Sequence, residues 1–190
     1  MQVPGTRSPE LARLEAVLFA ATEPLTTRQL AQQARLPVDR TRSLLRELNR
    51  LYAADRSGFH LRAVAGGWQL ATHKSLAPWL ARFFPPRQPP KLSPAAWETL
   101  AIIAYRQPIM RADIEAIRGV SCGDIIRQLI DKGLVRVVGH DESLGRPALY
   151  GTTRYFLQLF GLPSIKHLPP PQRSSAPNRS ATTNSGQAPP

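Results

Sequence analysis

Hydrophobic positions follow helical spacing and then strand spacing, and this order occurs twice along the 190-residue chain. Apolar residues recur at helical intervals after Ser8-Pro9 and again after Ser93-Pro94. Serine is a favourable N-cap, and proline suits the first helical position because the N–H that it lacks would have no intrahelical partner there. The pattern therefore predicts an opening helix in each half of the chain.

Two further helices are expected after each opening helix. Pro24 and Pro108 follow the opening helices, and Leu30 in the first half then corresponds to Ile114 in the second. Turns are predicted at residues 36–37 and 119–120, and third helices over 38–52 and 121–133, the latter with Ser121 as N-cap. Offsets of 84 or 85 residues hold throughout, which indicates two copies of one structural unit.

The pattern then changes to alternation with a period of two, which is typical of strands. Residues 59–64 and 68–72 flank Gly66-Gly67, a hairpin signal, and residues 134–140 and 148–152 flank a longer loop. Closing helices are expected over 75–84 and 153–160, with Gly161 as the C′ residue of the second. The predicted fold class is mainly α with small β-hairpins (α+β), built as two tandem winged helix-turn-helix domains.

Composition sets the expected domain boundaries. We predict an N-terminal tail (1–9), a first winged-helix domain (10–86), a Pro-rich linker (87–92), a second winged-helix domain (93–168) and a disordered tail (169–190). Residues 85–91 include four prolines, which makes a stiff spacer. Residues 163–190 contain seven prolines, five serines and no acidic residue, a composition typical of disorder.

Charge and cysteine content narrow the class of protein. The net charge of +12 favours contact with a polyanion. The alternative is that the excess of basic residues serves only to keep the protein soluble. The single cysteine, Cys122, excludes an internal disulfide and fits a reducing compartment. No apolar run approaches the roughly 20 residues of a membrane span, and the N-terminus lacks the apolar region of a signal peptide. We expect a cytoplasmic protein.

No arrangement of residues indicates catalysis. The histidines at 60, 73, 140 and 167 form no pair at i, i+3 or i+4, so a zinc site is not expected. Cys122 opens a predicted helix, which would lower its thiol pKa, but nothing in sequence marks it as a nucleophile and a small structural residue is the favoured interpretation. We expect no enzyme, no metal and no cofactor.

The opening helix of the second half is apolar on almost every side. A helix of this kind usually packs a second apolar surface against the other domain or another chain. The alternative is a central helix that is packed within its own domain. The residues are Trp97, Leu100, Ala101, Ile102, Ile103, Ala104 and Tyr105.

Two long segments carry a family resemblance. LSPAAWETLAIIAYRQPIMRADIEAIRGV (92–120) and GRPALYGTTRYFLQLFGLPSIKHLPP (145–170) resemble the second half of segregation and condensation protein B, and residues 10–84 resemble its first half more weakly. The resemblance implies a non-enzymatic subunit of the bacterial SMC–kleisin condensin. Such a subunit is a homodimer, chiefly through its first domain. It binds the kleisin, segregation and condensation protein A, and through it the SMC ATPase, and supports chromosome condensation and partition at the nucleoid during cell division.

The resemblance directs attention to surface residues. Arginine and aromatic side chains dominate interface hot spots, although Tyr150 and Phe156 have core packing as their alternative. Partner contacts are predicted for Trp97, Tyr105, Arg146, Tyr150 and Phe156. Dimer contacts are predicted for Leu11, Leu14, Val17 and Leu18.

This chain departs from the family at two points. Family members are often acidic, whereas this chain is basic, and Met110 stands where threonine is common. The third helix predicted in the first half carries Arg42, Arg46 and Arg50 at positions i, i+4 and i+8, so these basic residues share one face. This row of arginines has three alternative roles: contact with DNA, contact with an acidic patch on a partner protein, or a face that is only exposed to solvent. A winged-helix DNA-binding regulator is the alternative function.

The third helix of the second half is near neutral. Arg127 and Lys132 are set against Asp124 and Asp131, a balance that suits protein contact better than phosphate contact.

Overall fold

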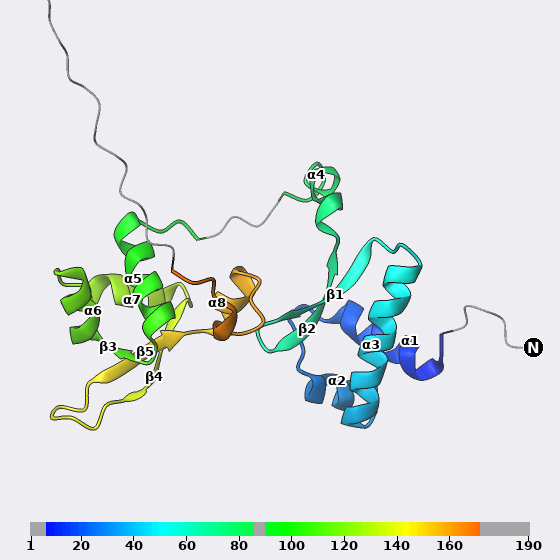
Figure 1. Ribbon diagram of the computed structural model, residues 1–190, viewed down its shortest axis with the longest axis horizontal. Coiled ribbons are helices and arrows are strands. Elements are labelled where there is room, and N and C mark those ends of the chain that lie inside the picture. Colours follow the sequence, from blue (N-terminus) through cyan, green and yellow to red (C-terminus); the bar gives the residue numbers. More distant parts are fainter. Residues whose placement is uncertain (1–6, 86–89, 172–190) are drawn as a thin grey trace, which may run out of the picture.

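The structure is a computed structural model that describes residues 7–85 and 90–171. Its helices and small antiparallel sheets form two groups, each with its own hydrophobic core. Figure 1 shows the first group around α1–α3 and the second around α5–α8. This mixed architecture agrees with the predicted fold class. The predicted tail from 172 onward and linker residues 86–89 lie outside the described residues.

The first group begins with three helices, α1 (Pro9–Ala20), α2 (Thr27–Ala34) and α3 (Val38–Ala54). Ser8 caps α1 by accepting a hydrogen bond from the Leu11 N–H, as the sequence predicts. Thr26 and Gln29 form a reciprocal capping box at α2. The apolar faces of the three helices meet in a core that includes Leu11, Leu14, Leu18, Leu30, Leu44, Leu45, Leu48 and Tyr52.

A two-stranded hairpin completes this core. The strands β1 (Phe59–Val64) and β2 (Gly67–Thr72) pair so that Val64 faces Gly67. The turn is therefore Ala65–Gly66, both with positive φ, and not Gly66–Gly67 as the sequence suggested. Positive φ at both positions matches the type I′ turns that join twisted strands. Leu25 adds an isolated bridge to Trp68 beside β2.

The second group repeats this order. It consists of α5 (Pro94–Arg106), β3 (Ile109–Met110), α6 (Arg111–Arg118), α7 (Gly123–Asp131), β4 (Val135–His140), β5 (Ala148–Thr152) and α8 (Arg154–Leu159). The strand order is β3-β5-β4, with β3 in the place of the Leu25 bridge. The N-cap of α7 is Cys122 without a side-chain bond, so the expectation of Ser121 as cap was wrong. The Ser121 hydroxyl instead donates to Glu115.

The closing helices of the two groups differ. After β5, α8 packs Phe156 into the core of its own group. After β2 the chain forms only η1 (Lys74–Leu76) and α4 (Ala77–Leu80), which contain no buried residue. In Figure 1, α4 stands away from α1–α3. The expected helix over 75–84 is therefore shorter than the sequence suggested, and Trp79, Phe83 and Phe84 are 59%, 64% and 71% exposed.

The two groups touch at the first hairpin. The N–H groups of Ala65 and Gly66 donate to the carbonyl oxygens of Leu162 and Pro163, each at 2.8 Å. The Arg154 guanidinium donates to the carbonyl of Pro24 at 2.5 Å. The segment after α8 thus lies against the turn of the first hairpin. Within residues 7–85 and 90–171, no helix has both the length and the apolar character needed to cross a bilayer.

Candidate partner-binding site

An apolar cavity of about 400 Å³ lies between α5, α8 and the segment that follows α8. Its walls are almost entirely aliphatic and aromatic. An open hollow of this composition is unfavourable in water, and a partner side chain that filled it would remove apolar surface from solvent. The lining residues are Trp97, Leu100, Ala101, Ala104, Tyr105, Phe156, Phe160, Leu162, Leu168 and Pro169.

Helix α5 supplies one wall because it is apolar on two faces. Leu100 and Ile103 are buried in the core, while Trp97, Ala101 and Tyr105, spaced by four residues, lie along a second, exposed face. Trp97 and Tyr105 remain 39% and 42% exposed. The helix therefore has the second surface that its sequence predicted, and that surface lines the cavity.

Helix α8 supplies the floor and the opposite wall. Thr153 caps the helix, and its hydroxyl accepts a hydrogen bond from the Phe156 N–H. Phe156 is buried, and its ring lies 4.6 Å from that of Phe160. Phe160 in turn meets the Trp97 ring edge-to-face at 6.2 Å, a favoured aromatic arrangement. These rings fix the shape of the cavity across two helices.

The segment after α8 closes one end. The Tyr105 hydroxyl donates to the Pro169 carbonyl at 2.6 Å, which holds this segment beside α5. Phe160, Leu162, Leu168 and Pro169 were not among the predicted site residues. In the sequence these residues are apolar positions of the segment FGLPSIKHLPP. Their spacing did not reveal that this segment packs beside α5.

The structure brings together three of the five predicted partner residues. Trp97, Tyr105 and Phe156 all line the cavity. Tyr150, on β5, instead borders a polar hollow beside α7. Arg146 lies exposed in the loop between β4 and β5, with φ of 43°. Phe156 contributes as a core residue, so the exposed aromatic residues of the site are Trp97, Tyr105 and Phe160.

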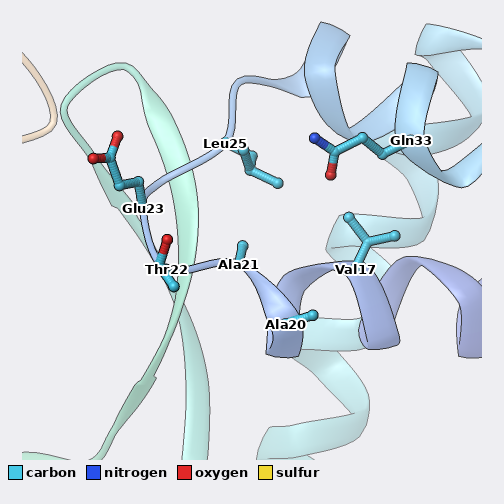
Figure 2. Close-up of a pocket in the computed structure, with 7 residues that line it drawn as sticks. All are labelled: Val17, Ala20, Ala21, Thr22, Glu23, Leu25 and Gln33. Carbon is cyan, nitrogen blue, oxygen red and sulfur yellow. The ribbon is translucent and has the colours of Figure 1, made fainter.

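A second hollow, of about 440 Å³, lies at the end of α1 (Figure 2). Figure 2 shows the side chains of Leu25 and Gln33 extending toward each other, with Val17 on the helix below them. Polar side chains share its lining, so it offers less apolar surface than the α5–α8 cavity. Its lining residues are Val17, Ala20, Ala21, Thr22, Glu23, Leu25 and Gln33.

Burial changes the predicted dimer contacts. Leu11, Leu14 and Leu18 are buried in the core of the first group, because the apolar stripe of α1 packs against α2 and α3. These three leucines have no surface for a second copy, and their assignment as dimer contacts does not fit this packing. Val17 is half-buried beside the hollow of Figure 2, and Phe19 is exposed.

The predicted basic row is at the surface. Arg42, Arg46 and Arg50 are all exposed on α3. Arg42 is paired with Asp39 at 2.8 Å.

The cysteine and the acidic and histidine side chains that could take part in chemistry form no reactive arrangement within the described residues. Cys122 is buried, and burial, with the nearby Glu115 carboxylate, raises the pKa of its thiol, contrary to the lowered pKa expected at a helix start. The Cys122 N–H donates to Glu115 at 3.0 Å. Within the described part of the chain, no three His, Cys, Asp or Glu residues gather closely enough to hold a metal ion.

Comparison with known proteins points to one family. The family model for the segregation and condensation complex subunit ScpB matches residues 12–171. Segregation and condensation protein B of Syntrophotalea carbinolica is 48% identical over 158 residues, which cover 83% of this chain and 80% of that protein. The protein from Moorella thermoacetica is 46% identical, over 84% of this chain and 81% of its own length.

Solved structures of similar chains are also known. The dimer of an ScpB N-terminal domain complexed with an ScpA peptide is 30% identical, covering 43% of this chain and 95% of that one, with a TM-score of 0.39.

Proposed function

The chain belongs to the segregation and condensation complex subunit ScpB family, and on that premise we propose that it is a condensin subunit that binds the kleisin, segregation and condensation protein A. The kleisin would occupy the cavity between α5 and α8. In this proposal the protein performs no catalysis. It reaches the SMC ATPase through the kleisin and so supports chromosome condensation and partition at the nucleoid.

The observation that carries the proposal is the apolar cavity with exposed aromatic walls. Trp97, Tyr105 and Phe160 are open to solvent around a hollow of about 400 Å³. Interfaces are strongest where large aromatic side chains meet a partner in a well-packed pocket that excludes water. Such a cavity suits an amphipathic helix or an extended segment with apolar anchors, which are the recurring forms in which one protein presents a short segment to another.

The fold that presents this cavity is, in our proposal, a pair of winged helix-turn-helix domains. In each group three helices precede a hairpin, and the connection between second and third helices is short. The left-handed residues Arg35 and Gly119 end α2 and α6, which gives each turn its sharp change of direction. The proposed domains are 10–86 and 93–168, joined by 87–92.

Homodimerisation is the second part of the proposal, and α4 is the surface that supports it. Trp79 in α4 and Phe83 and Phe84 directly after it are exposed, and no residue between 74 and 85 is buried. The corresponding helix α8 buries Phe156 in a core. A second copy of the chain would cover the α4 residues and remove their apolar surface from water.

Affinity purification of the tagged chain from its own cells at moderate salt tests the proposed function. Binding to the kleisin predicts that segregation and condensation protein A co-purifies and brings the SMC ATPase with it. A variant chain with Ala101→Arg, which places a charged side chain in the cavity, should recover neither. Recovery of neither protein by the unaltered chain would contradict the proposal.

A further inference from the structure

We propose that α3 binds double-stranded DNA without sequence preference, through Arg46 and Arg50. This is a function of the first group, whereas the proposed kleisin site lies in the second. It would give the subunit its own hold on the chromosome in addition to its hold on the kleisin.

Two arginines on α3 face solvent without a counterion. Arg40 is bound to Glu10 at 2.6 Å and Arg42 to Asp39 at 2.8 Å. Among the ion pairs of residues 7–85 and 90–171, none includes Arg46 or Arg50. Since they lie four residues apart, their side chains leave the helix on one face about 6 Å apart. Of the three arginines in the row that the sequence predicts, Arg46 and Arg50 are therefore free of ion pairs among the described residues and Arg42 is paired with an aspartate.

These arginines border a wide, open hollow. The hollow measures about 620 Å³ and is lined by Ser43, Arg46, Asn49 and Arg50. The Asn49 side chain also accepts a hydrogen bond from the Leu61 N–H at 3.3 Å, which joins this face of the helix to β1. The arginines therefore stand on a helix fixed to the hairpin, and the surface they form is held in place by the fold.

The lining favours a nucleic acid over an acidic protein. All four side chains of the hollow are polar or cationic, and none is an apolar anchor of the kind that protein interfaces place at their centre. Interfaces with DNA are polar and positively charged, and arginine, serine and asparagine are among the residues that contact phosphate oxygens. The net charge of +12 adds a general attraction to a polyanion.

The corresponding helix of the second group provides an internal comparison. On α7, Arg127 is paired with Asp124 at 3.4 Å, and Asp131 and Lys132 adjoin each other at its end. This helix has no pair of free cations on one face. The proposal therefore assigns DNA contact to α3 alone, and α7 serves as its control.

Fluorescence anisotropy of two labelled duplexes of unrelated sequence, titrated with the full chain at several salt concentrations, tests this assignment. Both duplexes should bind with affinities within about threefold. The variant Arg46→Gln/Arg50→Gln should bind at least about tenfold more weakly at ~50 mM salt, and the slope of log K against log salt should fall in magnitude by roughly 2, near 0.9 for each lost phosphate contact. The variant Arg127→Gln/Lys132→Gln should match the unaltered chain.

Three results would overturn the assignment. These are no duplex binding at ~50 mM salt, a salt slope that the α3 variant leaves unchanged, and binding to poly-glutamate but not to duplex, which would make the arginines a site for an acidic protein. Circular dichroism of each variant is the control for folding. Kleisin binding by the α3 variant should equal that of the unaltered chain. A negative result for DNA binding is therefore distinct from a negative result for the proposed kleisin binding.

Discussion

Met110 precedes α6 at the position where Thr26 precedes α2. The Thr26 hydroxyl accepts a hydrogen bond from the Gln29 N–H at 3.3 Å, whereas Met110 makes no side-chain bond to its helix. The backbone at both positions is extended, with ψ of 157°, so a hydroxyl at residue 110 would be placed to act as a cap. Caps are local, which is why the sequence predicted Ser8 and Ser93 correctly.

Replacing Met110 with threonine should therefore stabilise the protein. We expect Met110→Thr to raise the free energy of unfolding by about 0.5–1 kcal/mol, because the new hydroxyl would accept from the Asp113 N–H. Thermal unfolding of the full chain measures this, with Thr26→Ala as the opposite change and an expected loss of about 1 kcal/mol. A lower melting temperature for Met110→Thr would show that the methionine is held for its packing.

Glu115 connects α6 to the start of α7. Its carboxylate accepts hydrogen bonds from the Cys122 N–H at 3.0 Å, the Ser121 hydroxyl at 3.2 Å and the Arg111 guanidinium at 3.0 Å. The bond from the Cys122 backbone, followed by the Ser121 hydroxyl and the Arg111 charge, lowers the pKa of this carboxyl below its ordinary value. Because its pKa is lower in the folded state, Glu115 stabilises the fold above its ordinary pKa, and this contribution is lost as pH falls through the folded-state pKa.

Substitution of Glu115 by glutamine should remove that acid dependence. Glu115→Gln is expected to be less stable than the unaltered chain near neutral pH, and the difference should shrink as pH falls below about 4.5. Urea unfolding at a series of pH values measures it, with Glu142→Gln in the β4–β5 loop as control. A difference that stays constant with pH would contradict this role.

At the scale of elements, the hairpins were predictable and their exact turns were not. Alternating hydrophobicity located β1, β2, β4 and β5, because alternation follows directly from one buried face. The turn at Ala65–Gly66 was misplaced by one residue, since three consecutive small residues, 65–67, leave the register open to sequence analysis. The position of Gly67 inside β2 is decided by the close approach of Leu25.

A side chain at Gly67 should disrupt that approach. A Cβ atom there would lie 2.8 Å from the backbone carbon and oxygen of Leu25, which cannot move without breaking the bridge to Trp68. We expect Gly67→Ala to destabilise the protein by about 1–3 kcal/mol. The matched control is Gly139→Ala in β4, where no atom lies within 4 Å of the added Cβ. Equal stability of the two variants in urea unfolding would contradict the packing described here.

At the scale of the whole molecule, the candidate site required tertiary information. Trp97 and Tyr105 were predictable because α5 is apolar on two faces, but their meeting with Phe160 and Leu162 depends on the return of the chain after α8. The α1 leucines that were predicted as dimer contacts pack into the core of their own group. Spacing could not reveal this, because an apolar stripe has the same spacing whether it faces a core or a partner. The exposure of α4 was likewise invisible, since its apolar pattern is that of a helix packed on its own core.

The exposed aromatic residues of α4 and of the turn after it give a test of the dimer. Trp79 in α4 and Phe83 in the turn meet edge-to-face at 5.6 Å. We expect Trp79→Ala/Phe83→Ala to weaken self-association at least tenfold, which corresponds to about 1.4 kcal/mol, while folding is kept because neither side chain is buried. Sedimentation velocity across a range of concentrations measures this. The control Ile117→Ala/Val120→Ala removes apolar residues of similar exposure, 54% and 55%, from elsewhere. Unchanged self-association of the α4 variant would exclude α4 from the dimer surface.

In our proposal the kleisin binds between α5 and α8, and titration with purified segregation and condensation protein A is the direct test. Ala101 lines the cavity and is exposed, so Ala101→Arg should obstruct the site without disturbing the core. Ala116→Arg places the same side chain on the exposed face of α6, outside the cavity. Calorimetry is expected to find binding at least about tenfold weaker for Ala101→Arg and unchanged for Ala116→Arg. Kleisin affinity of folded Ala101→Arg equal to that of the unaltered chain would contradict it.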